Sequence, residues 1–375
     1  MLKRLDWYII KKYIGTYILS IILIISISVI FDFTEKIDNF MENSAPVKAI
    51  IFDYYMNFIP FFANMFTPLF SFISVIFFTS KLANNSEIIA MLAGGMSFNR
   101  LLRPYFISAT LIGIFSFFLM GFIIPPDNKV RLEFEDKYIS KFKSEIARNI
   151  QMEVEPGIIV YFERYEERTQ TGYHFSLEKF EGKKLVSRMT ANTIKMDSLN
   201  HWKVKNYLIR DFNGMYETIN KGESLDTIIN MDPEDFFITA QQAAQMTNPQ
   251  LRRYIKKQEK RGLGNIQAFQ DEYYKRFSMP LASIILTLIG VSLASRKVRG
   301  GMGVNIGIGI ALSALFILFS TLSSTFAING SMNPLLAVWL PNILFLITGL
   351  FLYTKAPKED KLLIISVITR FNSSL

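Results

Sequence analysis

The chain has 375 residues, of which 50% are hydrophobic and 34 are phenylalanine, and it contains no cysteine. The apolar residues occur in blocks, a composition typical of a membrane protein and not of a globular one. The absence of cysteine excludes disulfide bonds and cysteine-based metal sites. The formal net charge is +9, but no polybasic run with interleaved aromatic residues occurs, so we expect no nucleic-acid partner.

Six apolar stretches are long enough to cross a membrane as helices, which takes about 20 residues for about 30 Å of hydrocarbon. They are approximately 13–33, 55–79, 105–125, 277–295, 303–328 and 334–354. The first stretch follows Lys11 and Lys12, as in a signal peptide. It is too long for that, and no cleavage site of small residues follows it, so we expect an uncleaved membrane helix.

The distribution of lysine and arginine predicts the orientation, because cytoplasmic loops are enriched in both. With a cytoplasmic N-terminus, the inner segments hold 14 basic residues, whereas the short outer loops hold only Lys36 and Lys48. Both termini are therefore expected in the cytoplasm of a multi-pass inner-membrane protein. The predicted regions are membrane helices at 1–125 with a cytoplasmic loop at 80–104, a periplasmic insert at 126–270, membrane helices at 271–354 and a cytoplasmic tail at 355–375.

The insert has the sequence pattern of an all-β domain. Ile158–Phe162 is a short apolar run, Thr190–Met196 is rich in β-formers, and polar and apolar residues alternate from Trp202. We expect Asn220–Gly222 to form a turn between strands. Several short strands predict a sandwich or barrel-like module. Residues 247–262 then predict a basic helix that leads into the fourth membrane stretch.

The sequence contains no recognisable catalytic machinery and no pattern that implies a cofactor. Gly94 and Gly95 are not followed by the Lys-Ser/Thr pair of a phosphate-binding loop, so ATP is not bound by that route. The two histidines, His174 and His201, leave a zinc site with a carboxylate formally open, but isolated surface histidines explain them better. We therefore predict no catalytic residue and no metal site.

The cytoplasmic loop at 80–104 has the pattern of a short capped helix. Asn85 or Ser86 is placed to cap it, Glu87 lies in its first turn, and Gly94-Gly95 would end it. Such an amphipathic helix suits a groove on a partner ATPase, although an ordinary charged connection is the simpler alternative. The candidate ATPase-coupling residues are Glu87, Ile88, Leu92, Gly94 and Arg100.

Several segments, in the right order, resemble the LptF/LptG permease family of lipopolysaccharide exporters. They are Leu5-Asp6-Trp7-Tyr8-Ile9, EIIAMLAGGMSFNRLLRP (87–104), Ala191 to Trp202-Lys-Val, NPQLRRYI (248–255), EYYKRFSMPLASIILTLIGVSLASR (272–296) and GSMNPLLAVWLPNILF (330–345). The opening segment is slightly closer to LptG than to LptF.

The resemblance implies the transmembrane subunit of an ABC transporter that extracts lipopolysaccharide from the inner membrane. Its expected partners are a second LptF/LptG-type permease, a cytoplasmic LptB-like ATPase dimer and periplasmic LptC/LptA-like β-proteins. The insert is then expected to be a β-jellyroll that passes the lipid to this periplasmic bridge. Two alternatives are a mechanotransmitting membrane protein and a membrane-anchored β-domain sensor or assembly factor, neither of which moves lipid.

The basic residues at the outer membrane boundary are candidates for contact with the phosphates of lipid A. They are Lys36, Lys129, Arg131 and Arg276. Interfacial snorkelling is the ordinary explanation for such residues. LptG-like proteins can carry a lysine near the outer end of the first span, where this chain has Asp32. Either Lys36, one turn later, replaces that lysine, or the charge lies on the partner permease.

Small residues recur every four positions in the fifth membrane stretch, at Gly303, Gly307 and Ala311. Such a face allows two helices to approach closely in lipid. The family resemblance implies that this face lines the gate against the other permease. Packing within the chain's own helical bundle is the alternative that sequence alone favours.

Overall fold

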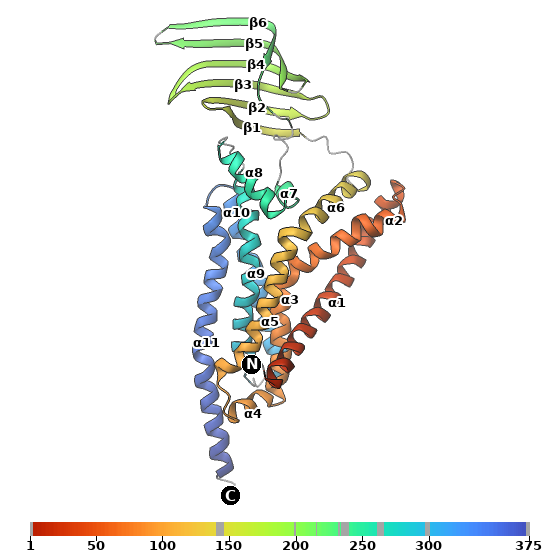
Figure 1. Cartoon of the computed structure of the whole chain (residues 1–375), viewed down its shortest axis with the longest axis vertical. Helices are drawn as coiled ribbons and strands as arrows, with labels where there is room; N and C mark the ends of the chain where they lie inside the picture. The colour runs from red at the N-terminus through yellow and green to blue at the C-terminus, as the bar shows by residue number, and fades with distance from the viewer. Residues whose placement is uncertain are drawn as a thin grey trace. The chain divides into compact units, whose positions relative to one another are not determined.

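The computed structural model describes residues 3–139, 146–198, 200–214, 216–231, 233, 240–260, 266–296 and 301–372. The chain forms two compact units. One comprises Met1–Ile139 with Asp271–Leu375, and the other comprises Ser140–Gln270. The first unit is a helical bundle and the second is built on a β-sheet (Figure 1).

The helical unit contains long helices and two π-helical segments, η1 and η2. Before the insert they are α1 (Arg4–Glu42), α2 (Val47–Ala49), η1 (Ile50–Tyr55), α3 (Met56–Asn84), α4 (Glu87–Ala93), α5 (Phe98–Phe118), η2 (Leu119–Ile123) and α6 (Ile124–Tyr138). After it they are α9 (Ile266–Ala294), of which the residues up to Gln270 belong to the second unit, α10 (Gly301–Ile328) and α11 (Pro334–Asn372). Within the described residues, six helices are long and apolar enough to cross a membrane. Each covers one of the six predicted stretches, the fourth except for its last residue, 295.

Helix α3 lies at the centre of the bundle and packs against α1, α5, α6 and α10. Hydrogen bonds between buried side chains support this packing, since polar groups in an apolar bundle need partners. The Tyr13 hydroxyl lies 2.5 Å from Ser71 Oγ and 2.7 Å from Thr287 Oγ1, which joins α1, α3 and α9. Asn305 Nδ2 donates to Ser80 Oγ at 3.0 Å and joins α10 to α3.

The π-helical segment η2 has a local cause in the sequence. It ends immediately before Ile124, Pro125 and Pro126, at the start of α6. A proline has no N–H, and its ring clashes with the carbonyl four residues earlier. A wider helical turn before the prolines relieves that clash and lets α5 continue into α6.

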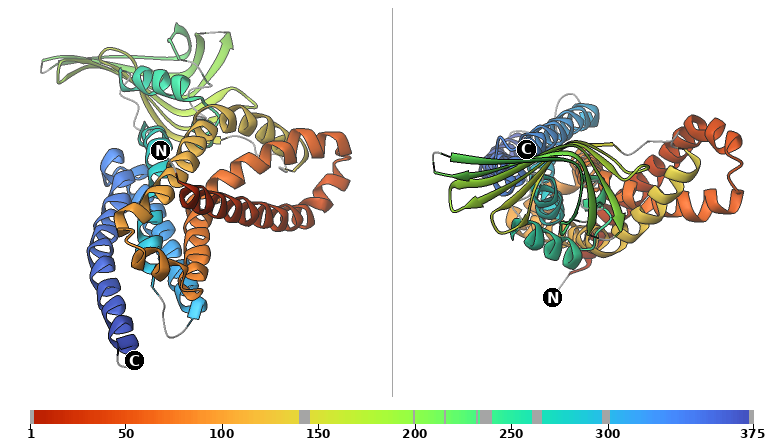
Figure 2. Two further views of the ribbon diagram at one scale, coloured as in Figure 1. Left: turned by 60° about the horizontal axis from the view of Figure 1, so that its bottom comes forward. Right: turned by 90° about the horizontal axis from the view of Figure 1, so that it is seen from above.

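The second unit contains one antiparallel sheet whose strands follow chain order, and Figure 2 shows it as a single curved layer. The strands are β1 (Ile146–Glu155), β2 (Ile158–Glu166), β3 (Thr171–Glu181), β4 (Lys184–Ser198), β5 (His201–Asn213) and β6 (Tyr216–Ile228). The prediction of six membrane helices with an inserted all-β domain is confirmed. The described strands form one sheet, in place of the paired layers of a sandwich.

The predicted turn at Asn220–Gly222 is wrong, because these residues lie inside β6. Gly222 is opposite Tyr207 on β5, and a Cβ atom on this glycine would lie 2.6 Å from the Tyr207 hydroxyl. The glycine therefore makes room for an aromatic ring in a strand interior. The connection between β5 and β6 lies earlier, at Gly214, whose φ is +72°.

One face of the sheet carries an apolar core centred on Trp202, which is 1% exposed. Its indole Nε1 donates to the Ile229 carbonyl at 3.2 Å, which holds the chain after β6 against this face. The hydroxyl of Tyr165 is also buried here, and burial raises its pKa, with a further contribution from Glu167.

Two helices, α7 (Ala240–Ala243) and α8 (Asn248–Lys260), complete the second unit. The start of α8 is set by Thr247 and Gln250: the Gln250 side chain accepts from the Thr247 N–H at 2.9 Å and from its hydroxyl at 2.8 Å. This arrangement caps the first turn. The predicted basic helix at 247–262 is thus confirmed over Asn248–Lys260, and residues 261–262 lie outside the described residues.

Candidate functional site

The predicted coupling loop contains a helix, α4, of seven residues from Glu87 to Ala93. It ends as the sequence predicts. The N–H groups of Gly95 and Met96 donate to the carbonyls of Leu92 and Met91, and Gly95 has a φ of +83°. This pair of bonds is the Schellman motif, which favours glycine at its left-handed position.

The start of α4 differs from the prediction. Ser86 is the first flanking residue but has a φ of +60°, and its side chain forms no cap hydrogen bond. Asn85 does not cap the backbone either; its Nδ2 donates to Glu87 Oε1 at 3.2 Å. Glu87 Oε2 also accepts from the Tyr8 hydroxyl at 3.3 Å, so this carboxylate joins α4 to α1.

The apolar stripe of α4 faces the chain's own bundle. Ile88 is 0% exposed and packs in a core cluster with residues of α1, α3, α5, α9 and α11, and Leu92 packs partly buried against the same cluster. The opposite face is small and exposed, with Ala90, Ala93 and Gly94. Ile88 and Leu92 therefore hold α4 on the bundle, and the small face is what remains for a partner.

Arg100, the last candidate coupling residue, lies in α5 and forms an ion pair with Asp6. Its Nη2 is 2.6 Å from Asp6 Oδ2, and the Asp6 side chain is only 4% exposed. The same carboxylate oxygen accepts from the backbone N–H of Lys3 at 2.7 Å and so closes the first turn of α1. Arg100 therefore fixes the start of α1 to α5.

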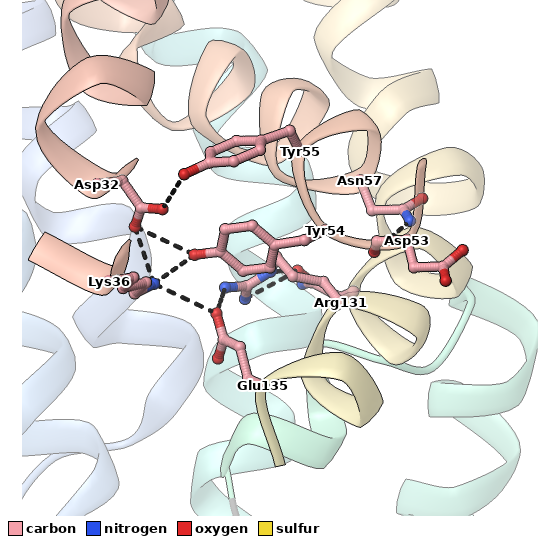
Figure 3. Close-up of polar contacts among 9 residues, drawn as sticks. Asp32, Lys36, Asp53, Tyr54, Tyr55, Asn57, Arg131 and Glu135 are labelled. Atoms are coloured by element: carbon pink, nitrogen blue, oxygen red, sulfur yellow. Dashed lines mark hydrogen bonds and ion pairs between the residues drawn. The ribbon is translucent and has the colours of Figure 1, made fainter. Parts of the chain in front are cut away.

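A second group of charges, the Lys36 cluster, lies where α1, η1 and α6 meet (Figure 3). It comprises Asp32, Lys36, Tyr54, Tyr55, Arg131 and Glu135. Lys36 Nζ lies 2.8 Å from Asp32 Oδ1 and 3.8 Å from Glu135 Oε1, and it donates a hydrogen bond to the Tyr54 hydroxyl. Asp32 and Lys36 thus share one site.

Each carboxylate of the Lys36 cluster has more than one donor or cation beside it. Asp32 accepts from the hydroxyls of Tyr54 at 3.1 Å and Tyr55 at 3.2 Å, and Glu135 Oε1 lies 2.8 Å from Arg131 Nη1. Two carboxylates and two cations give the cluster no net formal charge. An incoming anion would therefore have to replace Asp32 or Glu135 as the partner of a cation.

The other two basic candidates lie elsewhere. Lys129 is exposed on α6, with Nζ 4.0 Å from Glu133 Oε1. Arg276 on α9 is 1% exposed, and its Nε donates to Glu272 Oε1 at 3.0 Å. The structure therefore brings Lys36 and Arg131 together through Glu135 and gives Lys129 and Arg276 partners within their own helices.

The small residues of α10 form an open face. Gly303, Gly307 and Ala311 are exposed, and a Cβ atom on either glycine would meet nothing within 4 Å. Gly309 faces the other way, since a Cβ atom there would lie 2.4 Å from Ile76 Cδ1 on α3. The residue that packs inside the bundle is thus Gly309, and the Gly303–Gly307–Ala311 face remains available to a second chain.

No group of three or more histidine, aspartate or glutamate side chains within the described residues could hold a metal ion. His174 Nδ1 lies 2.5 Å from Glu163 Oε2 on the exposed surface of the sheet.

The sequence did not predict the side chains that pair with the candidate cations Lys36 and Arg100. Tyr54, Tyr55 and Glu135 complete the Lys36 cluster, and Asp6 is the partner of Arg100. Only Asp6 had a sequence signal, since an acidic residue in the first turn of a helix favours its N-terminus.

Comparison with protein families gives one match that covers most of the chain. The model of the lipopolysaccharide export system permease LptF/LptG matches residues 7–355. The chain belongs to the LptF/LptG family. The match does not separate LptF from LptG, and a comparison with curated proteins found no match.

Family membership gives the role of the chain in outline. It is the transmembrane component of the lipopolysaccharide export ABC system, a permease subunit in which no catalytic site is expected. It is a multi-pass membrane protein that works with other membrane components of that system, consistent with the inner membrane.

Proposed function

We propose that this permease extracts lipopolysaccharide from the outer leaflet of the inner membrane and passes it to LptC/LptA-like β-proteins in the periplasm. In this proposal it pairs with a second LptF/LptG-type permease and is driven by a cytoplasmic LptB-like ATPase dimer. Both termini lie in the cytoplasm and the sheet lies in the periplasm. Positive charge concentrated in the segments on one side supports this orientation.

One observation carries the lipid assignment: exposed apolar side chains occur along α1 up to the residue before the Lys36 cluster. Ile22, Ile30 and Phe31 are 57%, 64% and 72% exposed, and Phe31 immediately precedes Asp32. An amphiphile with acyl chains and a phosphorylated headgroup fits this arrangement. The apolar side chains of α1 can contact the acyl chains, and the cations of the Lys36 cluster can bind the phosphates. In this proposal the phosphate takes the place of Glu135 beside Lys36 and Arg131.

Replacing Lys36 with Gln tests this assignment. A charge-assisted hydrogen bond contributes about 1.5–3 kcal/mol, so loss of the cation should lower binding about tenfold or more. The measurement is photocrosslinking of lipopolysaccharide to a benzoylphenylalanine at Phe31 in the assembled complex. Lys137→Gln is the matched control, because Lys137 is exposed on α6 and lies outside both the cluster and the lipid-binding candidates. Undiminished crosslinking in Lys36→Gln would exclude Lys36 from the lipid site, and the same experiment with Arg276→Gln tests Arg276.

We further propose that α4 transmits the movement of the ATPase. A partner would contact its small exposed face while Glu87 holds its first turn to α1. Replacing Glu87 with Arg removes the two hydrogen bonds that its carboxylate accepts, from Tyr8 and Asn85. Because this carboxylate is not buried, the free energy of unfolding should fall by only about 1 kcal/mol, and the chain should still fold.

The expected result for Glu87→Arg is loss of ATPase co-purification together with loss of stimulated ATP hydrolysis. Glu133→Arg is the control, since it makes the same change of charge at an exposed site on α6. Unchanged yield of the complex and unchanged ATP hydrolysis in Glu87→Arg would show that α4 is only a connection.

A further inference from the structure

Helix α8 presents a basic face that the export function leaves unexplained. The four exposed cations on this helix are Arg252, Arg253, Lys256 and Lys257. At about 100° per residue, these positions fall within an arc of about 140° on the helix. The opposite side is apolar and packed, with Leu251 0% and Ile255 8% exposed.

The basic face lacks the ion pairs that several other cations of the chain form. On α9, Lys275 Nζ lies 2.7 Å from Asp271 Oδ2, and Arg276 pairs with Glu272. Across strands, Arg188 pairs with Glu178 and Arg210 with Glu217.

In the part of the chain that the structure describes, none of the four cations of α8 has an ion pair with an acidic side chain. The one acidic residue of the helix, Glu259, accepts from Gln270 Nε2 at 3.0 Å. The face is therefore an uncompensated patch of positive charge.

Contacts with the first turns of α9 fix the position of α8. The rings of Tyr254 and Phe269 pack with centroids 4.8 Å apart, and Glu259 bonds to Gln270. Helix α9 then continues without interruption from Ile266 to Ala294 as one of the candidate membrane spans (Figure 1). Helix α8 is thus packed on Phe269 and Gln270 of the helix that continues as a span.

The residues of α9 that contact α8 are close, along the helix, to the apolar stretch of the span. Eight residues separate Phe269 from Phe277, where the apolar stretch begins, and at 1.5 Å per residue this is about 12 Å. The headgroup layer occupies roughly 5–8 Å outside the hydrocarbon. The Debye length at physiological salt is about 8 Å, so headgroup charges act beyond this layer. The part of α9 that contacts α8 therefore lies within about 12 Å of the apolar stretch along the helix axis, a range over which headgroup charges act.

We propose that the basic face of α8 binds the phosphate headgroups of anionic phospholipids in the membrane that the chain spans. Basic residues beside a membrane helix are attracted to such headgroups. Phospholipid explains the patch better than nucleic acid does, because α8 packs on the helix that continues as a span and no exposed aromatic side chain lies among the four cations. This inference rests on the chain crossing a membrane and is independent of which lipid the permease exports.

The test uses the full chain in neutral detergent, mixed with equal amounts of dioleoyl phosphatidylglycerol and dioleoyl phosphatidylcholine. Native mass spectrometry measures how many molecules of each lipid are retained. The variant replaces Arg252, Arg253, Lys256 and Lys257 with Gln, which removes the charge with residues that favour a helix. The control replaces four exposed lysines of the sheet with Gln, namely Lys183, Lys184, Lys203 and Lys205.

We expect the wild type and the control to retain phosphatidylglycerol in preference to phosphatidylcholine. The α8 variant should retain at least about tenfold less phosphatidylglycerol than the wild type. Raising the salt concentration should weaken the retention by the wild type, which tests the proposal without any variant. Equal retention by variant and wild type would overturn it. Retention of added lipopolysaccharide but not of phosphatidylglycerol by the wild type would also overturn it, since the face would then recognise the exported lipid. Neither result depends on export activity, so the proposed function is tested separately.

Discussion

Replacing Arg100 with Ala should lower the free energy of unfolding by about 3 kcal/mol, because it leaves a buried carboxylate without its cation. Asp6 Oδ2 lies 2.6 Å from Arg100 Nη2, and its remaining donor would be the Lys3 N–H at 2.7 Å. The start of α1 depends on this pair, since Ile9 and Tyr13 pack on the bundle only a few residues further along. Thermal unfolding of the purified chain in detergent measures the loss as a fall in Tm.

The control for this prediction is Arg103→Ala on the same helix. Arg103 is exposed one turn after Arg100, so its loss should change Tm little. The double variant Asp6→Asn with Arg100→Ala should recover part of the loss, because it removes the unpaired charge. Hydrogen exchange should accelerate in the first turns of α1 in Arg100→Ala alone. If Arg100→Ala and Arg103→Ala unfold at the same temperature, the ion pair between Arg100 and Asp6 does not hold α1.

The membrane helices were predictable because the bilayer imposes a physical length. About 20 apolar residues are needed whatever the tertiary structure, so hydropathy identifies each span. The ends were less predictable: α1 runs from Arg4 to Glu42, well beyond the predicted 13–33. Those extensions are stabilised by contacts such as Arg100–Asp6 at one end and Lys36–Glu135 at the other. The second pair joins residues about a hundred positions apart, which no local pattern reveals.

Local rules succeeded where the backbone itself decides the outcome and failed where a distant partner decides it. Gly95 ends α4 because its left-handed conformation is a property of that residue. Gly222 carries the same sequence signal, yet it lies within β6 because the ring of Tyr207 occupies the space of its missing side chain. The burial of Ile88 likewise depends on α1 and α5, so the amphipathic pattern of α4 predicted a stripe but not which way it faces.

Replacing Gly307 with Leu should abolish formation of the permease heterodimer while leaving the chain folded. A side chain at Gly307 meets nothing within 4 Å in this chain, so it costs the monomer little. Close approach of two helices in lipid depends on small residues at the contact. Four extra heavy atoms on the face formed by Gly303, Gly307 and Ala311 would separate the helices and remove their packing. Co-purification of the tagged chain with the second permease measures the outcome.

Two matched variants separate a lost interface from a damaged fold. Thr348→Leu introduces the same side chain at an exposed position on α11, and the heterodimer should form normally. Gly309→Leu places that side chain against Ile76, which is fully buried, so it should lower the stability of the chain itself, by about 1–3 kcal/mol as overpacking does. The pattern expected is therefore a folded but unpaired Gly307→Leu beside a destabilised Gly309→Leu. Normal pairing of Gly307→Leu would instead assign the open face of α10 to contact with lipid and require the partner permease to bind another surface.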